Sequence, residues 1–184
     1  MTRLMVLAGP TAVGKGTIVR RLVEKYGDAW VSVSATTREP REGEEDGVDY
    51  YFVTESAFDA MIAEDALLEW AVVHGEHRYG TPRAAVQRHI ADGIPCILEI
   101  DLAGARQVRA SMPNATFVFV MPPSWEELVR RLELRATEDA DERARRLATA
   151  RIEMAAADEF EHVVVNDDLD TVVDEVHELL VAEG

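Results

Sequence analysis

The feature that most constrains the fold is the stretch LMVLAGPTAVGKGTIVRRL, residues 4–22. Five apolar residues run into Gly9, the pair Gly14 and Lys15 follows, and the next residues have helical spacing. This order is typical of a loop that binds phosphate through backbone N–H groups, the positive end of a helix and a lysine charge. The sequence therefore predicts a binding loop for a nucleotide polyphosphate. The alternative is an ordinary turn between a strand and a helix.

One residue departs from the usual pattern of such a loop. Gly16 stands where a Ser or Thr normally supplies a hydroxyl to Mg²⁺. Thr17 or water must therefore complete the coordination of a metal at this loop.

Apolar strands and helical segments alternate along most of the chain. We expect helices at 15–26 and 169–183, and buried strands at 4–8, 30–34, 94–100, 115–121 and 161–166. This alternation predicts an α/β fold, a doubly wound parallel sheet with helices on both faces. In such a sheet ligands bind beyond the carboxyl ends of the strands, where Ser34, Glu99 and Asp101 fall.

Residues 35–94 have a different pattern. They combine a strand at 49–53, an amphipathic helix at 54–70, and a turn that leads into another helix within 77–93. The length of 184 residues favours one compact domain. We expect a core of residues 1–34 and 95–184 that carries this insertion.

Charge and composition argue against several function classes. The net charge of −16 disfavours general nucleic-acid binding, because a phosphate backbone would be repelled, and the acidic run at 42–46 is most simply a solvated loop. No apolar run approaches the roughly 18 residues of a membrane span, and the chain begins with a strand rather than a signal peptide. The single cysteine, Cys96, lies in an apolar run that predicts a buried thiol. We therefore expect a cytoplasmic protein without a membrane partner.

The loop after residue 34 suits a phosphate monoester. Arg38 and Arg41 lie three apart, and Tyr50 follows shortly after. Planar guanidinium forks and a neutral phenol hydroxyl are donors that match phosphate oxygens. On their own, however, two loop arginines are more often surface residues.

Six motifs in order resemble those of the guanylate kinase family, the ATP:GMP phosphotransferases, over almost the whole chain. They are GPTAVGKGT, SVSATTREPREGE…GVDYYFV, LLEWAVVHGEHRYGT, ILEIDLAGARQVR, PPSWEELVRRLELR and VVVNDDLD. The resemblance is closest to the bacterial branch. It implies a GMP-binding subdomain inserted at about 35–94, a helical lid at about 131–146, and transfer of a phosphoryl group from MgATP to GMP, with dGMP as a further acceptor.

The resemblance also assigns residues to GMP. The phosphate would be held by Arg38, Arg41, Tyr50 and Tyr79, and the guanine would face Ser34, Glu69, Thr81 and Asp101. The chemistry agrees, because guanine presents two adjacent donors, N1–H and N2–H₂, to a carboxylate such as Glu69. Without the family, Glu69 would be interpreted as a surface acid at a helix end, and Asp101 as a helix N-cap.

The family pattern further implies an ATP site and a metal site. The expected ATP-binding residues are Gly9, Pro10, Thr11, Ala12, Val13, Gly14, Lys15, Gly16, Thr17 and Asn166. Glu99 resembles the acid that holds the water shell of Mg²⁺ beside Thr17, although it could instead pair with a core arginine.

Several cations are expected to neutralise charge on the transferred phosphoryl group. The expected catalytic residues are Lys15, Arg38, Arg131, Arg135 and Arg146. Arg131 and Arg135 are four apart and share one face of a helix. Each lid arginine could equally form a salt bridge with an acid, the candidates being Glu127, Glu138 and Glu142. Leu134 and Ala136 stand where the family usually has glycine, which favours helix continuation and predicts a stiffer lid hinge.

Three alternatives compete with this interpretation. His74, His77 and His89 could form a structural metal site, but no matching ligand set accompanies them. Another nucleoside monophosphate kinase would share the loop and lid, although Glu69 favours guanine. A guanylate-kinase-like scaffold domain would bind phosphorylated peptides without catalysis, yet such domains typically lose the loop lysine that this chain keeps.

Overall fold

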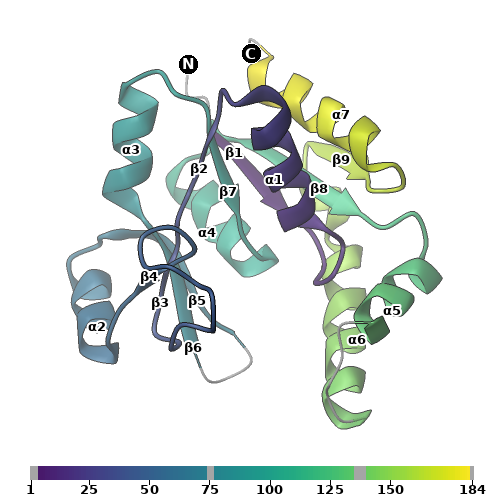
Figure 1. The fold of residues 1–184 in the computed structure, drawn as a ribbon, viewed down its shortest axis with the longest axis horizontal. Coiled ribbons are helices and arrows are strands. Elements are labelled where there is room, and N and C mark those ends of the chain that lie inside the picture. Colours follow the sequence, from purple (N-terminus) through teal and green to yellow (C-terminus); the bar gives the residue numbers. More distant parts are fainter. Residues whose placement is uncertain (1–3, 74–76, 135–139, 183–184) are drawn as a thin grey trace.

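A five-stranded parallel sheet forms the centre of the molecule (Figure 1). The computed structural model describes residues 4–73, 77–134 and 140–182. The strand order is β2-β7-β1-β8-β9, with bounds Trp30–Val31, Cys96–Glu99, Leu4–Ala8, Thr116–Met121 and His162–Val165. Strand β1 therefore lies between β7 and β8, in parallel register with both. The predicted doubly wound sheet is confirmed.

The helices cover both faces of this sheet. Strand β1 points Met5 and Leu7 to one face, where the core includes residues of α1 (Lys15–Tyr26), α5 (Trp125–Leu134) and α7 (Leu169–Val181). It points Leu4, Val6 and Ala8 to the other face, against residues of α3 (Arg83–Ala91) and α4 (Leu102–Ser111). Strands buried on both faces explain why their sequences are continuously apolar. Cys96 is part of this core and is buried, as predicted.

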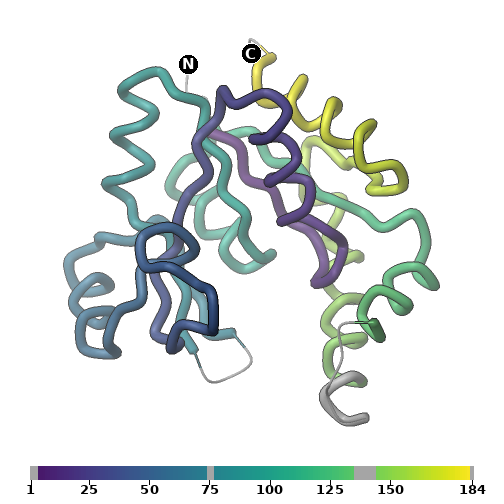
Figure 2. The backbone as a smooth tube through the Cα atoms, viewed as in Figure 1, coloured from purple at the N-terminus to yellow at the C-terminus, as the bar shows by residue number. Residues whose placement is uncertain are grey.

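A second sheet projects from the core (Figure 1). Its order is β4-β3-β6-β5, with bounds Tyr51–Phe52, Ala35–Thr36, His77–Pro82 and Leu67–Val73. Helix α2 (Glu55–Ala63) covers it with a small core of its own, built on Ala35, Phe58 and Leu67. The chain leaves the central sheet after β2 and returns through α3 to β7, as Figure 2 shows.

Two predictions in this region were wrong. The helix expected at 54–70 ends at Ala63, because Asp65 takes a left-handed conformation (φ 52°) and the following residues pair with β6 as strand β5. Residues 77–82, expected as a turn, form β6. In both segments pairing between strands outweighs the local helical or turn preference. The strands expected at 30–34 and 49–53 are also shorter, at Trp30–Val31 and Tyr51–Phe52.

The remaining elements follow the second half of the sheet. Helix α6 (Ala140–Ala155) and a short 3₁₀ turn (Ala157–Glu159) connect α5 to β9. The helices described here are all too short or too polar to cross a membrane.

Gly9 gives a test of how tightly the end of β1 is packed. Its φ is 151°, and a Cβ there would lie 2.5 Å from the carbonyl oxygen of Val120 in β8. Gly9→Ala should therefore lower the free energy of unfolding by more than about 2 kcal/mol. Gly93→Ala is the control, because its φ is also positive (76°) but its Cβ would meet nothing within 4 Å. We expect the control to lose about 1–2 kcal/mol in urea unfolding followed by tryptophan fluorescence. Equal losses in the two variants would contradict the packing argument.

Candidate active site

Residues 9–17, which comprise the turn after β1 and the start of α1, lie at the carboxyl end of the central sheet. We call this segment the phosphate loop. Gly14 has a φ of 104°, and a Cβ there would lie 2.5 Å from Nδ2 of Asn166. Ala12 is also left-handed, with a φ of 61°. The loop encloses a pocket of about 400 Å³ lined by Thr11, Ala12, Val13, Gly14, Lys15, Gly16, Thr17, Arg20 and Glu99. A polar pocket at a helix N-terminus suits an anion.

Lys15 lies across this loop. Its Nζ is 2.6 Å from the carbonyl oxygen of Gly9 and 3.4 Å from that of Pro10. Backbone carbonyl oxygens at the start of the loop thus hold the ammonium group, and Lys15 is one of the residues that line the pocket. This arrangement places a positive charge where a polyphosphate would enter.

Side chains from distant parts of the sequence hold the loop in place. Asn166, which follows β9 and is 8 % exposed, donates from Nδ2 to the carbonyl oxygen of Val13 at 2.8 Å. Arg131 of α5 donates to the same oxygen at 3.1 Å and to the carbonyl oxygen of Asn166 at 3.3 Å. These contacts give Asn166 a supporting role, and its direct contact with adenine stays a prediction.

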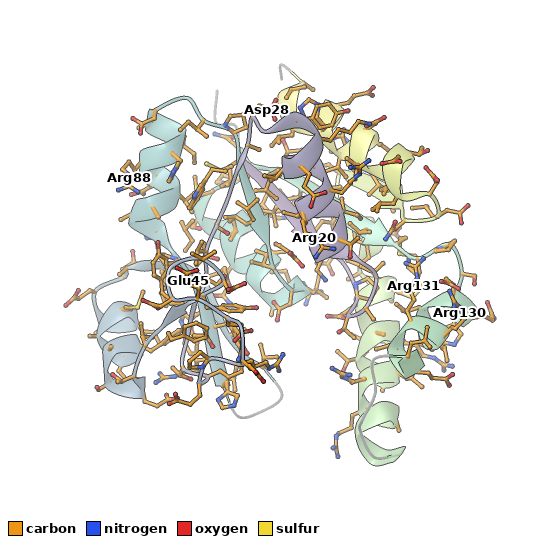
Figure 3. All side chains as sticks on the ribbon, in the orientation of Figure 1. Arg20, Asp28, Glu45, Arg88, Arg130 and Arg131 are labelled. Atoms are coloured by element: carbon orange, nitrogen blue, oxygen red, sulfur yellow. The ribbon has the colours of Figure 1, made fainter. Side chains whose placement is uncertain are left out.

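Arg131 and Arg130 are neighbours in α5 but diverge. Arg131 extends toward the phosphate loop, whereas Arg130 points to solvent (Figure 3). Both donate to Glu127, and these hydrogen bonds lower the pKa of that carboxyl to about 2. The predicted alternative of a salt bridge with Glu127 is therefore present, together with the contact to the loop. Arg146 lies half-buried on α6, while Arg135 is outside the described residues.

Glu153, on α6, also contacts the loop and was missed by sequence analysis. Its Oε2 accepts from the backbone N–H of Thr11 at 3.2 Å. Burial raises the pKa of Glu153 above its ordinary value, and the charge of Lys15 opposes that shift. No motif marks this acid in the sequence, because only the folding of α6 onto the loop brings it there.

Glu99 and Thr17 are the oxygen donors that fit a divalent metal. A Cβ on Gly16 would lie 3.4 Å from Oε2 of Glu99, so the bare glycine leaves room beside that carboxylate. Thr17 and Glu99 line the same pocket. Hard cations bind carboxylate and hydroxyl oxygens, with phosphate and water completing the shell. Thr17 and Glu99 therefore offer oxygen ligands for a metal, although Gly16 lacks the hydroxyl group that is usual at its position.

A second cluster forms in the insertion around Arg38. Its guanidinium donates to both carboxylate oxygens of Glu44, at 2.9 and 3.0 Å, and its Nε donates to the hydroxyl of Tyr79 at 3.0 Å. The Glu44 hydrogen bonds hold the pKa of Arg38 well above its usual range, and they hold the pKa of Glu44 below its usual range. Arg41 joins the cluster through its backbone N–H, which donates to Glu44 at 2.7 Å.

Glu44 is an exception to the prediction that the acidic run is a solvated loop. It belongs to the acidic run at 42–46, but its side chain is only 20 % exposed, whereas Glu42, Glu45 and Asp46 are exposed. The sequence carries no signal for this pairing beyond the proximity of the acid to Arg38.

Tyr50 packs against this cluster. Its ring lies edge-on to Tyr79, with centroids 5.7 Å apart, and the Arg38 guanidinium lies 5.4 Å from its centroid. Burial raises the pKa of Tyr50, and the charge of Glu99 adds to the shift. The charge of Glu99 thus acts on this cluster at Tyr50.

Glu69 is a buried acid, not the surface acid of the alternative interpretation. It is 6 % exposed on β5, and its Oε1 accepts from the hydroxyl of Thr81 at 2.6 Å. Burial raises its pKa to about 7, and the nearby charge of Asp101 acts in the same direction. Asp101 is also the N-cap of α4, since it accepts from the N–H of Gly104 at 2.7 Å. Ser34 is half-buried just before β3.

The histidines of the alternative metal site have other surroundings. His89 stacks on Trp30, with ring centroids 3.9 Å apart. His77 lies in β6, and His74 is outside the described residues. Within the described ranges, no three His, Cys, Asp or Glu side chains are grouped to hold a metal.

Comparisons with known proteins identify the family. The guanylate kinase family model matches residues 1–183. The chain belongs to the guanylate kinase family.

Individual relatives agree. A guanylate kinase of Leifsonia xyli is 59 % identical over 96 % of this chain and 68 % of its own length. A guanylate kinase of Thermobifida fusca is 56 % identical over 98 % of this chain and 91 % of its own. The crystal structure of guanylate kinase from Anaplasma phagocytophilum superposes with a TM-score of 0.78 at 31 % identity, covering 96 % of this chain and 83 % of that one. Shikimate kinase from Bacteroides thetaiotaomicron, at 16 % identity and a TM-score of 0.54 over 97 % of this chain and 98 % of that one, shares the fold alone.

The buried carboxyl of Glu69 predicts a pH dependence of stability in this family member. Its pKa is about 7 in the folded protein against an ordinary value of 4.5, so folding takes up a proton between these pH values. Because the folded state binds more protons there, the free energy of unfolding should fall as pH rises from 4.5 through about 7. Glu69→Gln cannot titrate and should lack this component. Urea unfolding of both proteins at several pH values measures the difference, and a difference independent of pH would contradict the burial argument.

Proposed function

We propose that the two clusters divide one phosphoryl transfer between them, the phosphate loop holding ATP and residues 35–94 holding GMP. The reaction follows from the family: the enzyme transfers the γ-phosphoryl group of ATP to GMP and forms ADP and GDP. The observation that supports the division is that cationic side chains gather in two places, around Lys15 in the pocket and around Arg38 in the insertion. We also propose dGMP as a further acceptor. We propose the cytoplasm as the location of the enzyme, where ATP and GMP are available.

The donor half rests on the phosphate loop. Its backbone N–H groups and Lys15 would orient the phosphates of ATP, while Asn166, Arg131 and Glu153 keep the loop in its conformation. Pre-organised donors of this kind stabilise charge that develops in the transition state. Little covalent chemistry is left to the protein in phosphoryl transfer, so positioning and charge supply the catalysis.

The acceptor half rests on the Arg38 cluster. Arg38, Arg41, Tyr50 and Tyr79 would hold the phosphate of GMP, and Glu44 keeps the Arg38 fork in place beforehand. An oxygen of this phosphate attacks the γ-phosphorus of ATP, and the bond from that phosphorus to the bridging oxygen of ADP breaks. No general base is required, because the attacking oxygen already carries negative charge.

The base of GMP would be recognised by the buried polar group at the junction of β5, β6 and α4. The carboxylate of Glu69 accepts from guanine N1–H and N2–H₂, and Thr81, Ser34 and Asp101 complete the contacts. Adenine has an acceptor at N1, which would face this carboxylate lone pair to lone pair. This difference favours guanine over other monophosphates.

Guanylate kinases are ATP-using kinases that generally need a divalent metal. We propose Mg²⁺, with Glu99 and Thr17 as the protein groups beside it. When bound with ATP, Mg²⁺ would neutralise charge on the phosphate groups. Arg131, Arg135 and Arg146 would add positive charge from a lid formed by about 131–146, with the core at 1–34 and 95–184.

Lys15→Ala tests the donor half. The variant loses the side-chain cation of the loop, so kcat should fall by about 10³. Lys25→Ala is the matched control, because Lys25 lies in the last turn of the same helix and pairs with Asp174. It should keep the wild-type rate in a coupled assay of ADP formation. A Lys15→Ala enzyme that retained a tenth of wild-type turnover would refute the assignment of the loop to ATP.

Arg41→Met tests the acceptor half. Arg41 is exposed beside the Arg38 cluster, so its loss should spare the fold while raising KM for GMP at least about tenfold and leaving KM for ATP nearly unchanged. Arg88→Met, on the outer side of α3, removes an exposed arginine elsewhere and should change neither constant (Figure 3). Equal changes in both KM values would show that this loop does not hold GMP.

A further inference from the structure

Glu69 sits at an irregular point of the insertion. Strand β5 is an edge strand, and its pairing with β6 shifts register between Leu67 and Trp70, so that one extra residue is accommodated there. A bulge re-aims side chains and leaves part of the ladder unpaired. The strand pairing alone therefore does not determine where the Glu69 carboxylate lies.

Helix α4 of the core packs directly against this irregular strand (Figure 1). Gly104 is buried in the first turns of α4, and a Cβ on it would lie 2.7 Å from Oε2 and 3.2 Å from Cδ of Glu69. Atoms essentially never approach a Cβ so closely. The carboxylate thus rests against helix backbone in a space that exists because residue 104 has no side chain.

The next turn of α4 supplies a second contact. The side-chain amide of Gln107 accepts from the N–H of Trp70 at 3.1 Å and donates to the carbonyl oxygen of Trp70 at 2.8 Å. It therefore occupies the outer edge of β5 as a neighbouring strand would. Trp70 directly follows Glu69, so this pair of hydrogen bonds fixes the backbone next to the acid.

We propose that α4 positions the Glu69 carboxylate in two ways, directly through the bare backbone of Gly104 and indirectly through the amide of Gln107 on the backbone of Trp70, and that this positioning sets the preference for guanine. The proposal rests on the proposed role of Glu69 in reading the base. A carboxylate must meet N1–H and N2–H₂ together, and a misplacement of about 1 Å costs such an arrangement much of its effect. Gly104 and Gln107 are positioning residues, since neither needs to touch the nucleotide.

Gly104→Ala is the sharpest variant. Alanine favours a helix more than glycine does, so α4 itself should fold at least as well. The added methyl group requires the end of Glu69 to move. We expect kcat/KM for GMP to fall about tenfold to a hundredfold, with KM for ATP changed by less than about twofold.

Inosine monophosphate supplies a readout that a merely structural defect would not move. It keeps N1–H but lacks the 2-amino group, so the ratio of kcat/KM for GMP to that for inosine monophosphate reports how well the carboxylate meets both donors. This ratio should fall in Gly104→Ala toward its value in Glu69→Gln. Gln107→Ala should lower it in the same direction by a smaller factor, because Gln107 is exposed and water can replace its hydrogen bonds.

Arg106→Ala is the control on the same helix. Arg106 neighbours Gln107 but pairs with Glu159, away from Glu69, and its loss should leave the ratio unchanged. Thermal unfolding of each variant is measured beside the kinetics. If Gly104→Ala does not fold, the ratio measured in Gln107→Ala tests the proposal.

The possible failures can be told apart. A wild-type enzyme that did not phosphorylate GMP would refute the proposed function itself. A wild-type enzyme that prefers GMP, with the ratio unchanged in the folded variants, would refute only the positioning role of α4. Equal losses of kcat/KM for both monophosphates and for ATP would also refute the positioning role of α4.

Discussion

The central place of β1 in the sheet is the constraint on which the site depends. Because β1 lies between β7 and β8 in parallel register, the carboxyl ends of β7 and β8 both reach the loop that follows β1. The end of β7 brings Glu99 beside Gly16, and β8 presses its backbone against Gly9. The loop is thus shaped by its neighbours as much as by its own residues, and Arg131 and Glu153 add support from α5 and α6.

Electrostatics explains how a chain with net charge −16 can bind anionic nucleotides. At both proposed binding clusters a carboxylate holds a guanidinium group in place: Glu44 holds Arg38, and Glu127 holds Arg131. Such pairs limit the entropy that a flexible arginine loses when a phosphate arrives. The same carboxylates weaken the local positive potential, so binding relies on geometry at close range more than on long-range attraction.

Most of the central sheet could be predicted from the sequence, because strands buried on both faces are continuously apolar and α1 begins at Lys15 and ends before Gly27 as its pattern indicates. Residues 64–73 and 77–82 could not be predicted locally, since Leu67, Leu68 and Tyr79 become strand residues only because β5 and β6 pair with each other. The phosphate loop was recognisable from its glycines and Lys15. Glu44, Glu153 and Gln107 were not, because their importance arises from contacts between segments that sequence spacing does not reveal.

The two ends of the insertion enter and leave through strands that lie side by side. Trp30 and Val31 of β2 pair with Cys96 and Ile97 of β7, so the chain departs from one strand and returns to the strand beside it. In evolutionary terms, a continuous segment spliced between adjacent strands can be exchanged, lengthened or rebuilt without rearranging the order of the core. Under the proposed division of the site, acceptor choice would be a heritable unit, separable from the machinery that supplies the phosphoryl group.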